Sequence, residues 1–308
     1  MARVAIFAPH PLLSIAIEDR GSEGDDIHLH AAGQGVWVAR MAAELGAEPV
    51  LCGLIGGETG TMLRSLLDRL PGERRLVETA GNSGCYVQDH RSGERQLVSQ
   101  SFSPPPSRHE LDELVSTACA AALDCNTLVV CNPFPPDALP VEVYGSLVAD
   151  VSQNGTPVLV DLSSPRLESA LEGRPALVKL NDWELAQFVS GPIASPAELR
   201  AAAESVRDAG AKLVVVTRGG EPAFVLRGEQ AWTLAAPRFE RGFREGCGDS
   251  MMGGIAAGLA SGAEWQQALI TGAAAGAANF LRHGLGSGSD EVVEDLADRV
   301  TLSPAGER

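Results

Sequence analysis

The feature that most constrains the fold is a regular alternation between short apolar runs and longer amphipathic segments. Six runs have the length and β-branched character of buried strands: RVAIFAP, PVLCGLIG, TLVVCN, PVLVD, ALVKLN and KLVVVT. Helical patterns separate most of them. Parallel strands need such connections, because the chain must return to the same edge of the sheet each time. The sequence therefore predicts an α/β fold, with a mainly parallel central sheet and helices on both faces.

Two regions depart from this alternation. Residues 12–32 contain the segments LSIAIED and DIHLHAA, and residues 83–101 contain a hairpin pattern that turns at Ser92-Gly93. Polar and apolar residues alternate in both regions, as they do in a sheet with one solvated face. We expect these strands to form a small β-sheet lid, inserted in a single domain that spans residues 1–308.

Composition excludes several partner classes. A chain of 308 residues with 44% apolar residues can bury a large core. The net charge of −16 argues against nucleic acid, because phosphate backbones are bound by Lys and Arg. No apolar run reaches the length of a membrane span, and Pro interrupts the N-terminal apolar segment early. The six scattered cysteines lack zinc or redox spacing, so we expect reduced thiols and a cytoplasmic location.

Three common catalytic motifs are missing from the sequence. It has no G-x-x-x-x-G-K-[ST] phosphate loop and no G-x-S-x-G nucleophile turn. The dinucleotide fingerprint fails as well, because Val38 stands where the third glycine belongs after Gly33 and Gly35. The sequence therefore argues against a serine hydrolase and against an enzyme that transfers hydride from a dinucleotide.

Four segments nevertheless carry residues suited to an anion site. They are AAGQGVWVARMAAELG with the following CGLIGGETG, then VKLNDWEL, VVVTRGGEPAFVL and GCGDSMMGG. A glycine turn that opens a helix offers unpaired N–H groups to a phosphate. Each segment alone has an ordinary explanation. Asp249 alone is typical of a helix N-cap, Asn181 with Glu184 of a helix start, and Gly219-Gly220 of a turn.

Together, the order and spacing of these segments resemble the ribokinase-like (PfkB) carbohydrate kinases over nearly the whole chain. The resemblance is greatest to the branch of 1-phosphofructokinase and tagatose-6-phosphate kinase. GCGDSMMGG resembles the Gly-Ala-Gly-Asp signature of the family, and KLNDWEL resembles its Lys-Pro-Asn-x-x-Glu. The resemblance implies a ribokinase-like fold and an ATP-dependent kinase that phosphorylates a hydroxyl of a sugar or sugar derivative.

The resemblance also implies roles for single residues. Asp249 takes the proton of the acceptor hydroxyl, while the backbone of Gly246, Cys247 and Gly248 holds the transferred phosphoryl group. Asn181 and Glu184 organise Mg²⁺ through its waters. The expected nucleotide contacts are Lys179, Asn181, Thr217, Gly219, Gly220 and Asn279. ATP and Mg²⁺ are the implied cofactors, with a monovalent cation as a further candidate.

Departures from the family pattern gather on the acceptor side, where we expect contacts from His10, Ser14, Gly33, Gln34, Trp37 and Tyr86. Gln34 stands at a family Lys position and Gly84 at an Arg position. These cations suit a sugar phosphate, since charged hydrogen bonds contribute about 1.5–3 kcal/mol each. The sequence therefore predicts poor use of fructose 1-phosphate and tagatose 6-phosphate. Trp37 and Tyr86 offer flat apolar faces instead.

Two alternatives stay open at this stage. The changed acceptor residues also suit a catalytically weak ligand-binding or regulatory protein that keeps the kinase fold. A nucleoside kinase of the same fold is the second alternative. A homodimer through the lid is a further expectation, because an exposed edge strand favours a partner.

Overall fold

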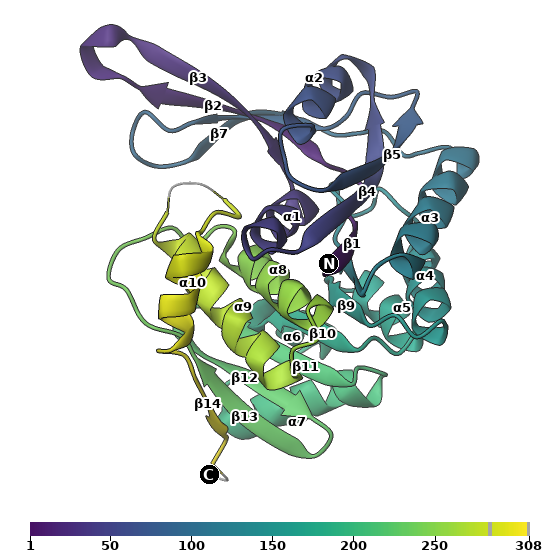
Figure 1. Ribbon diagram of the computed structural model, residues 1–308, viewed down its shortest axis with the longest axis vertical. Helices are drawn as coiled ribbons and strands as arrows, with labels where there is room; N and C mark the ends of the chain where they lie inside the picture. The colour runs from purple at the N-terminus through teal and green to yellow at the C-terminus, as the bar shows by residue number, and fades with distance from the viewer. Residues whose placement is uncertain (283–284, 307–308) are drawn as a thin grey trace.

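The computed structural model describes residues 1–282 and 285–306, which form a large central sheet, its covering helices and a separate small sheet (Figure 1). The strands of the central sheet are β1 (Arg3–Phe7), β4 (Glu48–Gly56), β5 (Glu73–Thr79), β8 (Thr127–Cys131), β9 (Val158–Asp161), β10 (Leu177–Asn181), β11 (Leu213–Arg218), β12 (Glu221–Arg227), β13 (Gln230–Ala235) and β14 (Thr301–Pro304). Their order is β14-β13-β12-β11-β10-β9-β8-β1-β4-β5. Neighbours from β5 to β11 are parallel, and the three strands after β11 are antiparallel.

The α/β prediction is confirmed, and all six predicted runs are strands of the central sheet. The six apolar runs did not predict β5 and β14, the strands at the two edges of this sheet. Most residues of β5 are half-buried and most of β14 are exposed, so their sequences lack the continuous apolar character that marks a strand buried on both faces.

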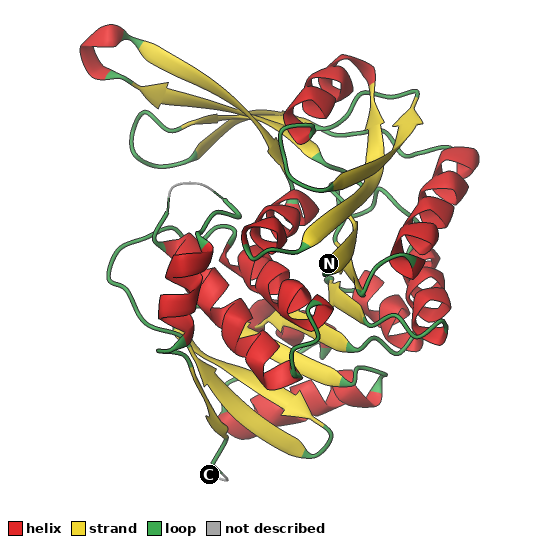
Figure 2. Ribbon diagram, in the orientation of Figure 1, coloured by secondary structure: helices red, strands yellow, loops and turns green. Residues whose placement is uncertain are grey.

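Helices cover both faces of the central sheet (Figure 2). One apolar cluster contains side chains of α1 (Gln34–Glu44), α2 (Gly57–Leu67), α8 (Cys247–Ala260), α9 (Trp265–Phe280) and α10 (Asp290–Ala297). The other contains side chains of α3 (Arg108–Leu123), α4 (Glu142–Gln153), α5 (Arg166–Glu172), α6 (Asp182–Phe188) and α7 (Pro196–Asp208). Alternate residues of β1 divide between them: Val4 and Ile6 join the first cluster, Ala5 and Phe7 the second.

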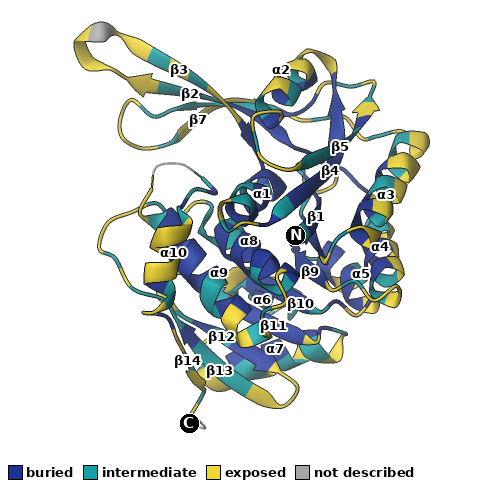
Figure 3. Ribbon diagram, in the orientation of Figure 1, coloured by how far each residue is buried: buried dark blue, intermediate teal, exposed yellow. Residues whose placement is uncertain are grey.

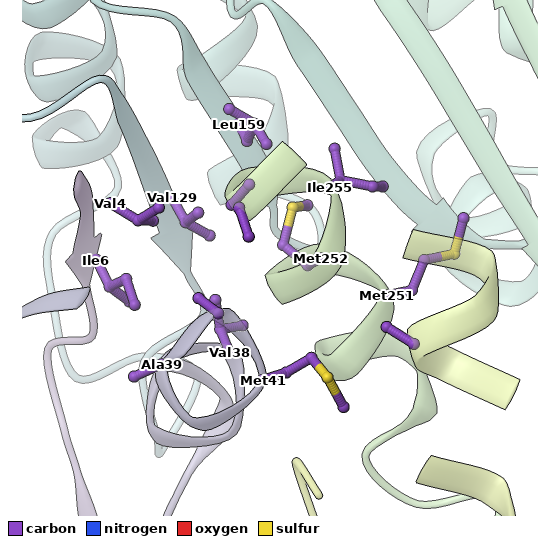
Figure 4. Packing of buried hydrophobic residues seen from close by; sticks show 14 of the residues in the cluster. Val4, Ile6, Val38, Ala39, Met41, Val129, Leu159, Met251, Met252 and Ile255 are labelled. Atoms are coloured by element: carbon purple, nitrogen blue, oxygen red, sulfur yellow. The ribbon is translucent and has the colours of Figure 1, made fainter. Parts of the chain in front are cut away.

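The first cluster fixes the position of α8 over the sheet. Met252 and Ile255 of α8 are completely buried, together with Val38 and Met41 of α1. Figure 4 shows these side chains in one cluster with Ile6, Val129 and Leu159 of the sheet. Burial of such side chains contributes about 1.5–3 kcal/mol each. The beginning of α8 is therefore held rigidly against the sheet.

The small sheet forms the predicted lid. Its strands are β2 (Leu12–Asp19), β3 (Asp25–Ala32), β6 (Cys85–Asp89) and β7 (Gln96–Ser101), in the order β3-β2-β6-β7, and a 3-10 turn η1 (Gly21–Glu23) joins β2 to β3. These bounds lie within the predicted residues 12–32 and 83–101. Strand β7 is exposed at every residue, and much of β3 is exposed (Figure 3).

Local signals in the sequence also agree with the structure. Ser195 caps α7, Pro196 occupies its first turn, and the Glu198 side chain accepts a hydrogen bond from the N–H of Ser195 at 2.9 Å. In the described part of the chain, no helix combines the length and apolar character that a membrane crossing requires.

Candidate active site

Three polar or ionisable side chains of adjacent parallel strands face α8. They are Cys131 of β8, Asp161 of β9 and Lys179 of β10. Cys131 pairs with Asp161 across the sheet. Cys131 belongs to the apolar cluster that contains α1 and α8, as do Leu159 and Leu177, which lie two residues before Asp161 and Lys179. Since alternate residues of a strand share a face, all three side chains point to the helix that carries Asp249.

Asp161 and Lys179 form a buried ion pair. The distance from Lys179 Nζ to Asp161 Oδ2 is 2.8 Å, and the two side chains are 6% and 4% exposed, respectively. Burial alone lowers the pKa of Lys179, but the charges of Asp161, Asp249 and Glu184 raise it overall. The ammonium group is therefore held charged beneath α8.

The glycine turn brings backbone N–H groups next to this ammonium. Gly246 is the N-cap of α8, and its φ of 75° lies in the left-handed region that favours glycine. A Cβ at Gly248 would lie 3.3 Å from Lys179 Nζ, so the side chain of any other residue would press on the cation. The first N–H groups of a helix have no partner within it, so the turn joins unpaired donors to a fixed positive charge.

Asp249 is the third residue of α8 and not its N-cap, so the capping explanation for this carboxylate is wrong. The side chain keeps some solvent access but lies deep among protein atoms. This burial, followed by the charge of Asp161, raises its pKa to about 7, while Lys179 and a hydrogen bond with Gln34 act in the opposite direction. A carboxylate with a pKa near neutrality is well matched to general-base chemistry.

Gln34, whose contact with the acceptor stays a prediction, is hydrogen-bonded to other parts of the protein. Its Oε1 accepts a hydrogen bond from the N–H of Asn132 at 2.7 Å, and its side chain also bonds to Asp249. Asn132 in turn accepts from the Nε of Arg166 at 3.2 Å. Gln34 thus ties α1, the loop after β8 and Asp249 together.

Sequence reasoning missed Asp161, Asn132 and Arg166 as members of this site. A signal was present for the first two, because Asp161 ends the predicted strand PVLVD and Asn132 ends TLVVCN. In parallel sheets, ligands bind at the carboxyl ends of the strands. Nothing in the local sequence distinguishes Arg166 from a surface arginine, because its burial depends on the packing of α5 under the loop after β8.

Asn181 and Glu184 form a reciprocal capping box at the start of α6. The Glu184 N–H donates to Asn181 Oδ1 at 2.9 Å, and the Asn181 N–H donates to Glu184 Oε2 at 2.8 Å. Burial, followed by the charge of Asp161, raises the pKa of Glu184. No group of three His, Cys, Asp or Glu side chains converges as direct metal ligands anywhere in the described ranges. A cation here would have to keep most of its waters, as Mg²⁺ commonly does.

The remaining nucleotide-side residues occupy two places. Thr217 pairs with Asn181 across β10 and β11, so it lies at the same sheet edge. Gly219 and Gly220 follow in an exposed turn, where an added Cβ would meet no atom within 4 Å. Asn279 is completely buried, and its Nδ2 donates to the carbonyl of Glu245 at 2.8 Å. It supports the residues just before the glycine turn, and its contact with adenine stays a prediction.

The acceptor-side residues surround the start of α1 and the inner face of the lid. Gly33 caps α1 with a φ of 107°. His10 is buried, both of its ring nitrogens lack a partner within the described residues, and burial lowers its pKa to about 4. Ser14 and Tyr86 pair across β2 and β6 and share a side-chain hydrogen bond. Trp37 is half-buried, with its backbone packed under Gly286.

Comparisons with known proteins agree with this arrangement. Residues 8–292 match the family model described as pfkB family carbohydrate kinase. Phosphofructokinase-2 from Escherichia coli, solved in complex with potassium, superposes with a TM-score of 0.85 at 26% identity, covering 97% of this chain and 99% of that one. A possible 1-phosphofructokinase from Thermotoga maritima gives a TM-score of 0.85 at 17% identity, covering 99% and 100%.

The family match covers most of the chain, and the solved structures share its fold from end to end. The phosphoryl-transfer chemistry implied by the sequence therefore applies to this molecule: it is a kinase that phosphorylates a sugar with ATP. The chain belongs to the PfkB family of carbohydrate kinases.

Proposed function

We propose that Asp249 is the general base of this kinase. The observation that carries the proposal is a carboxylate with a pKa raised to about 7, next to an ammonium and behind a glycine turn. The acceptor hydroxyl loses its proton to Asp249 while its oxygen bonds to the γ-phosphorus of ATP. The bond from that phosphorus to the bridging oxygen of ADP breaks. The unpaired N–H groups at the start of α8 and the charge of Lys179 stabilise the transferred oxygens.

The residues around Asp249 fit Mg²⁺ held through water. Asp161, Glu184 and Asp249 place three carboxyl groups around the single ammonium of Lys179, which leaves an excess of negative charge. Glu184 has one oxygen that the capping box does not use. Mg²⁺ bound there would neutralise charge on the phosphates of ATP. The open turn at Gly219 and Gly220 leaves room for the nucleotide beside Thr217.

We also propose that a monovalent cation binds near the glycine turn. Its support is the E. coli phosphofructokinase-2 structure, which is named as a complex with potassium. Replacing KCl with tetramethylammonium chloride at constant ionic strength should lower kcat. An unchanged kcat would remove the monovalent cation from the proposal.

We further propose that the acceptor is an unphosphorylated sugar or sugar derivative. Three arginines near the candidate acceptor side are already bonded to protein groups. Arg95 pairs with Glu245, Arg40 donates to the carbonyl of Ala31, and Arg166 donates to Asn132. Gln34 replaces a cation next to Asp249. A phosphate on the acceptor, if held beside Asp249, would therefore meet three carboxyl groups and the single ammonium of Lys179.

The decisive experiment is a screen for ADP release with Mg-ATP over free sugars, sugar phosphates and nucleosides. Asp249→Asn should reduce kcat by about 10²–10⁴-fold, the usual contribution of a general base, with little change in ATP affinity. Strong turnover of fructose 1-phosphate at micromolar KM would contradict the acceptor proposal. Silence with every acceptor while ATP still binds would favour the regulatory alternative, and a nucleoside as the best acceptor would favour a nucleoside kinase.

Assembly and location complete the proposal. We infer a homodimer through the lid, because the lid carries exposed apolar side chains on the face opposite Ser14 and Tyr86. Ile27 of β3 is 61% exposed. Ile17 pairs with Ile27 and Ile15 with Leu29, which places these four side chains on one face. The six free cysteines fit a reducing compartment such as the cytoplasm.

A further inference from the structure

The lid and the glycine turn are joined by an ion pair between residues 150 positions apart. Arg95 lies in the hairpin between β6 and β7, and its guanidinium donates to the carboxylate of Glu245. The Arg95 side chain is only 18% exposed. Its guanidinium also lies over the ring of Phe243, 5.9 Å from the ring centroid. The arginine therefore contacts two of the four residues that precede Gly246.

Two residues of α9 also hold residues 243–245 by hydrogen bonds. The carbonyl of Glu245 accepts from Asn279 Nδ2 at 2.8 Å, and the N–H of Phe243 donates to the carbonyl of Phe280 at 2.8 Å. Glu245 directly precedes Gly246, whose carbonyl accepts the hydrogen bond from Ser250 that opens α8 at 2.8 Å. A displacement of Glu245 would therefore shift the N–H groups at the start of α8.

The ion pair also lies beside the inner face of the lid. Burial raises the pKa of the Tyr86 hydroxyl, which also shares a hydrogen bond with Ser14, and the charges of Arg95 and Glu245 act on it in opposite directions. Tyr86 is one of the acceptor contacts proposed above. Arg95 and Glu245 therefore stand between the proposed acceptor contacts and the turn that receives the phosphoryl group.

We propose that the Arg95–Glu245 ion pair positions the glycine turn relative to the lid, so that an acceptor held under the lid is aligned with Asp249 and the N–H groups of α8. The inference rests on the proposed function. Arg95 and Glu245 are positioning residues, since they act on the reaction through the turn and the lid. The ion pair is partly exposed on the Glu245 side, so we expect its effect in turnover more than in global stability.

The test is a charge-reversal cycle with Arg95→Glu, Glu245→Arg and the double variant. Arg91→Ala is the matched control, because Arg91 sits in the same hairpin but forms its ion pairs with Asp89 and Asp25 inside the lid. Each single reversal should lower kcat/KM for the acceptor by about tenfold or more, as loss of a charged hydrogen bond would. ATP affinity should stay within twofold. The double variant should recover most of the loss, and Arg91→Ala should resemble the unchanged enzyme.

Hydrogen exchange gives a readout that needs no acceptor. Amides of the β6–β7 hairpin and of residues 243–248 should exchange faster together in each single variant, and protection should return in the double variant. Losses that add in the double variant, or exchange that rises equally in Arg91→Ala, would overturn the ion-pair proposal. The two segments could also change their exchange together as expected while the protein turns over no acceptor. That result would count against the proposed function and leave the ion-pair proposal intact.

Discussion

Asp249 must be ionised to accept a proton, although its surroundings favour the neutral form. Burial and the charge of Asp161 raise its pKa to about 7. With both substrates below saturation, kcat/KM reports the free enzyme. We therefore expect kcat/KM to fall about tenfold per pH unit below pH 7 and to level off above it. Asp161→Asn should move this acidic limb to lower pH, because it removes a charge that opposes ionisation. An acidic limb that does not move would contradict this account of Asp249.

The same pKa predicts how stability depends on pH. A carboxyl whose pKa is raised in the folded state holds a proton that the unfolded chain releases, so stability decreases as pH rises from about 4 to about 7. Asp249→Asn removes this dependence. Urea unfolding should show the variant more stable than the unchanged protein at pH 8, by an amount on the order of 3 kcal/mol or less, with the difference shrinking at pH 5. A constant difference across this range would contradict the raised pKa.

The ion pair of Lys179 and Asp161 makes a second prediction for single residues. Removing one member of a buried pair leaves an uncompensated charge, which costs about 3–5 kcal/mol. Lys179→Met should therefore lower the free energy of unfolding by this amount in urea titrations. The double variant Lys179→Met/Asp161→Leu should recover much of the loss, because it removes both buried charges. Losses that simply add would show that the pair is not coupled.

The local sequence pattern indicates where Asp249 and its glycines lie, but it does not indicate the partners of Gln34, for a physical reason. Asp249 and its glycines lie within four consecutive residues, so their local pattern carries the geometry. Gln34 meets Asn132 and Asp249 only through contacts between distant segments. Its partners depend on the packing of α1 against the sheet, which no local pattern specifies.

At the scale of elements, the position of Asp249 depends on how closely α8 packs against α9. A Cβ added at Gly272 of α9 would lie 2.5 Å from Ile255 Cγ1 and 2.7 Å from the carbonyl of Met251. Gly272→Ala should therefore push the helices apart, lower stability by about 1–3 kcal/mol and reduce kcat, because Met251 is two residues from Asp249. Thermal unfolding and steady-state kinetics measure both effects.

Gly191→Ala is the control for this substitution. Its added Cβ would meet no atom closer than 3.8 Å, so stability should change by less than about 0.5 kcal/mol. Equal effects of the two substitutions would show that the contact between α8 and α9 does not position the base. The glycines of α8 and α9 were visible in the sequence, but which of them touch another helix depends on how the two helices cross.

At the scale of the whole molecule, the sequence predicted the lid but not how its strands pair. Strands β2 and β6 are parallel neighbours, although about 70 residues that include α1 and α2 separate Ser14 from Tyr86. Pairing between strands so far apart in the chain depends on how the whole domain folds. The alternation of polar and apolar residues within each strand decides only which side chains share a face. That shared face places polar side chains inward and Ile15, Ile17, Ile27 and Leu29 outward.

The outward apolar face predicts an association of two copies through their lids. Ile27 is 61% exposed although it is a large aliphatic side chain, and burying it would contribute about 1.5–3 kcal/mol. Sedimentation equilibrium at tens of micromolar should therefore show a dimer, and Ile27→Glu should convert it to a monomer because the carboxylate would be buried without a partner. Val292→Glu is the control, since Val292 is an exposed aliphatic residue of α10, outside the lid. If the unchanged protein is a monomer, or if the dimer survives Ile27→Glu, this face does not mediate self-association.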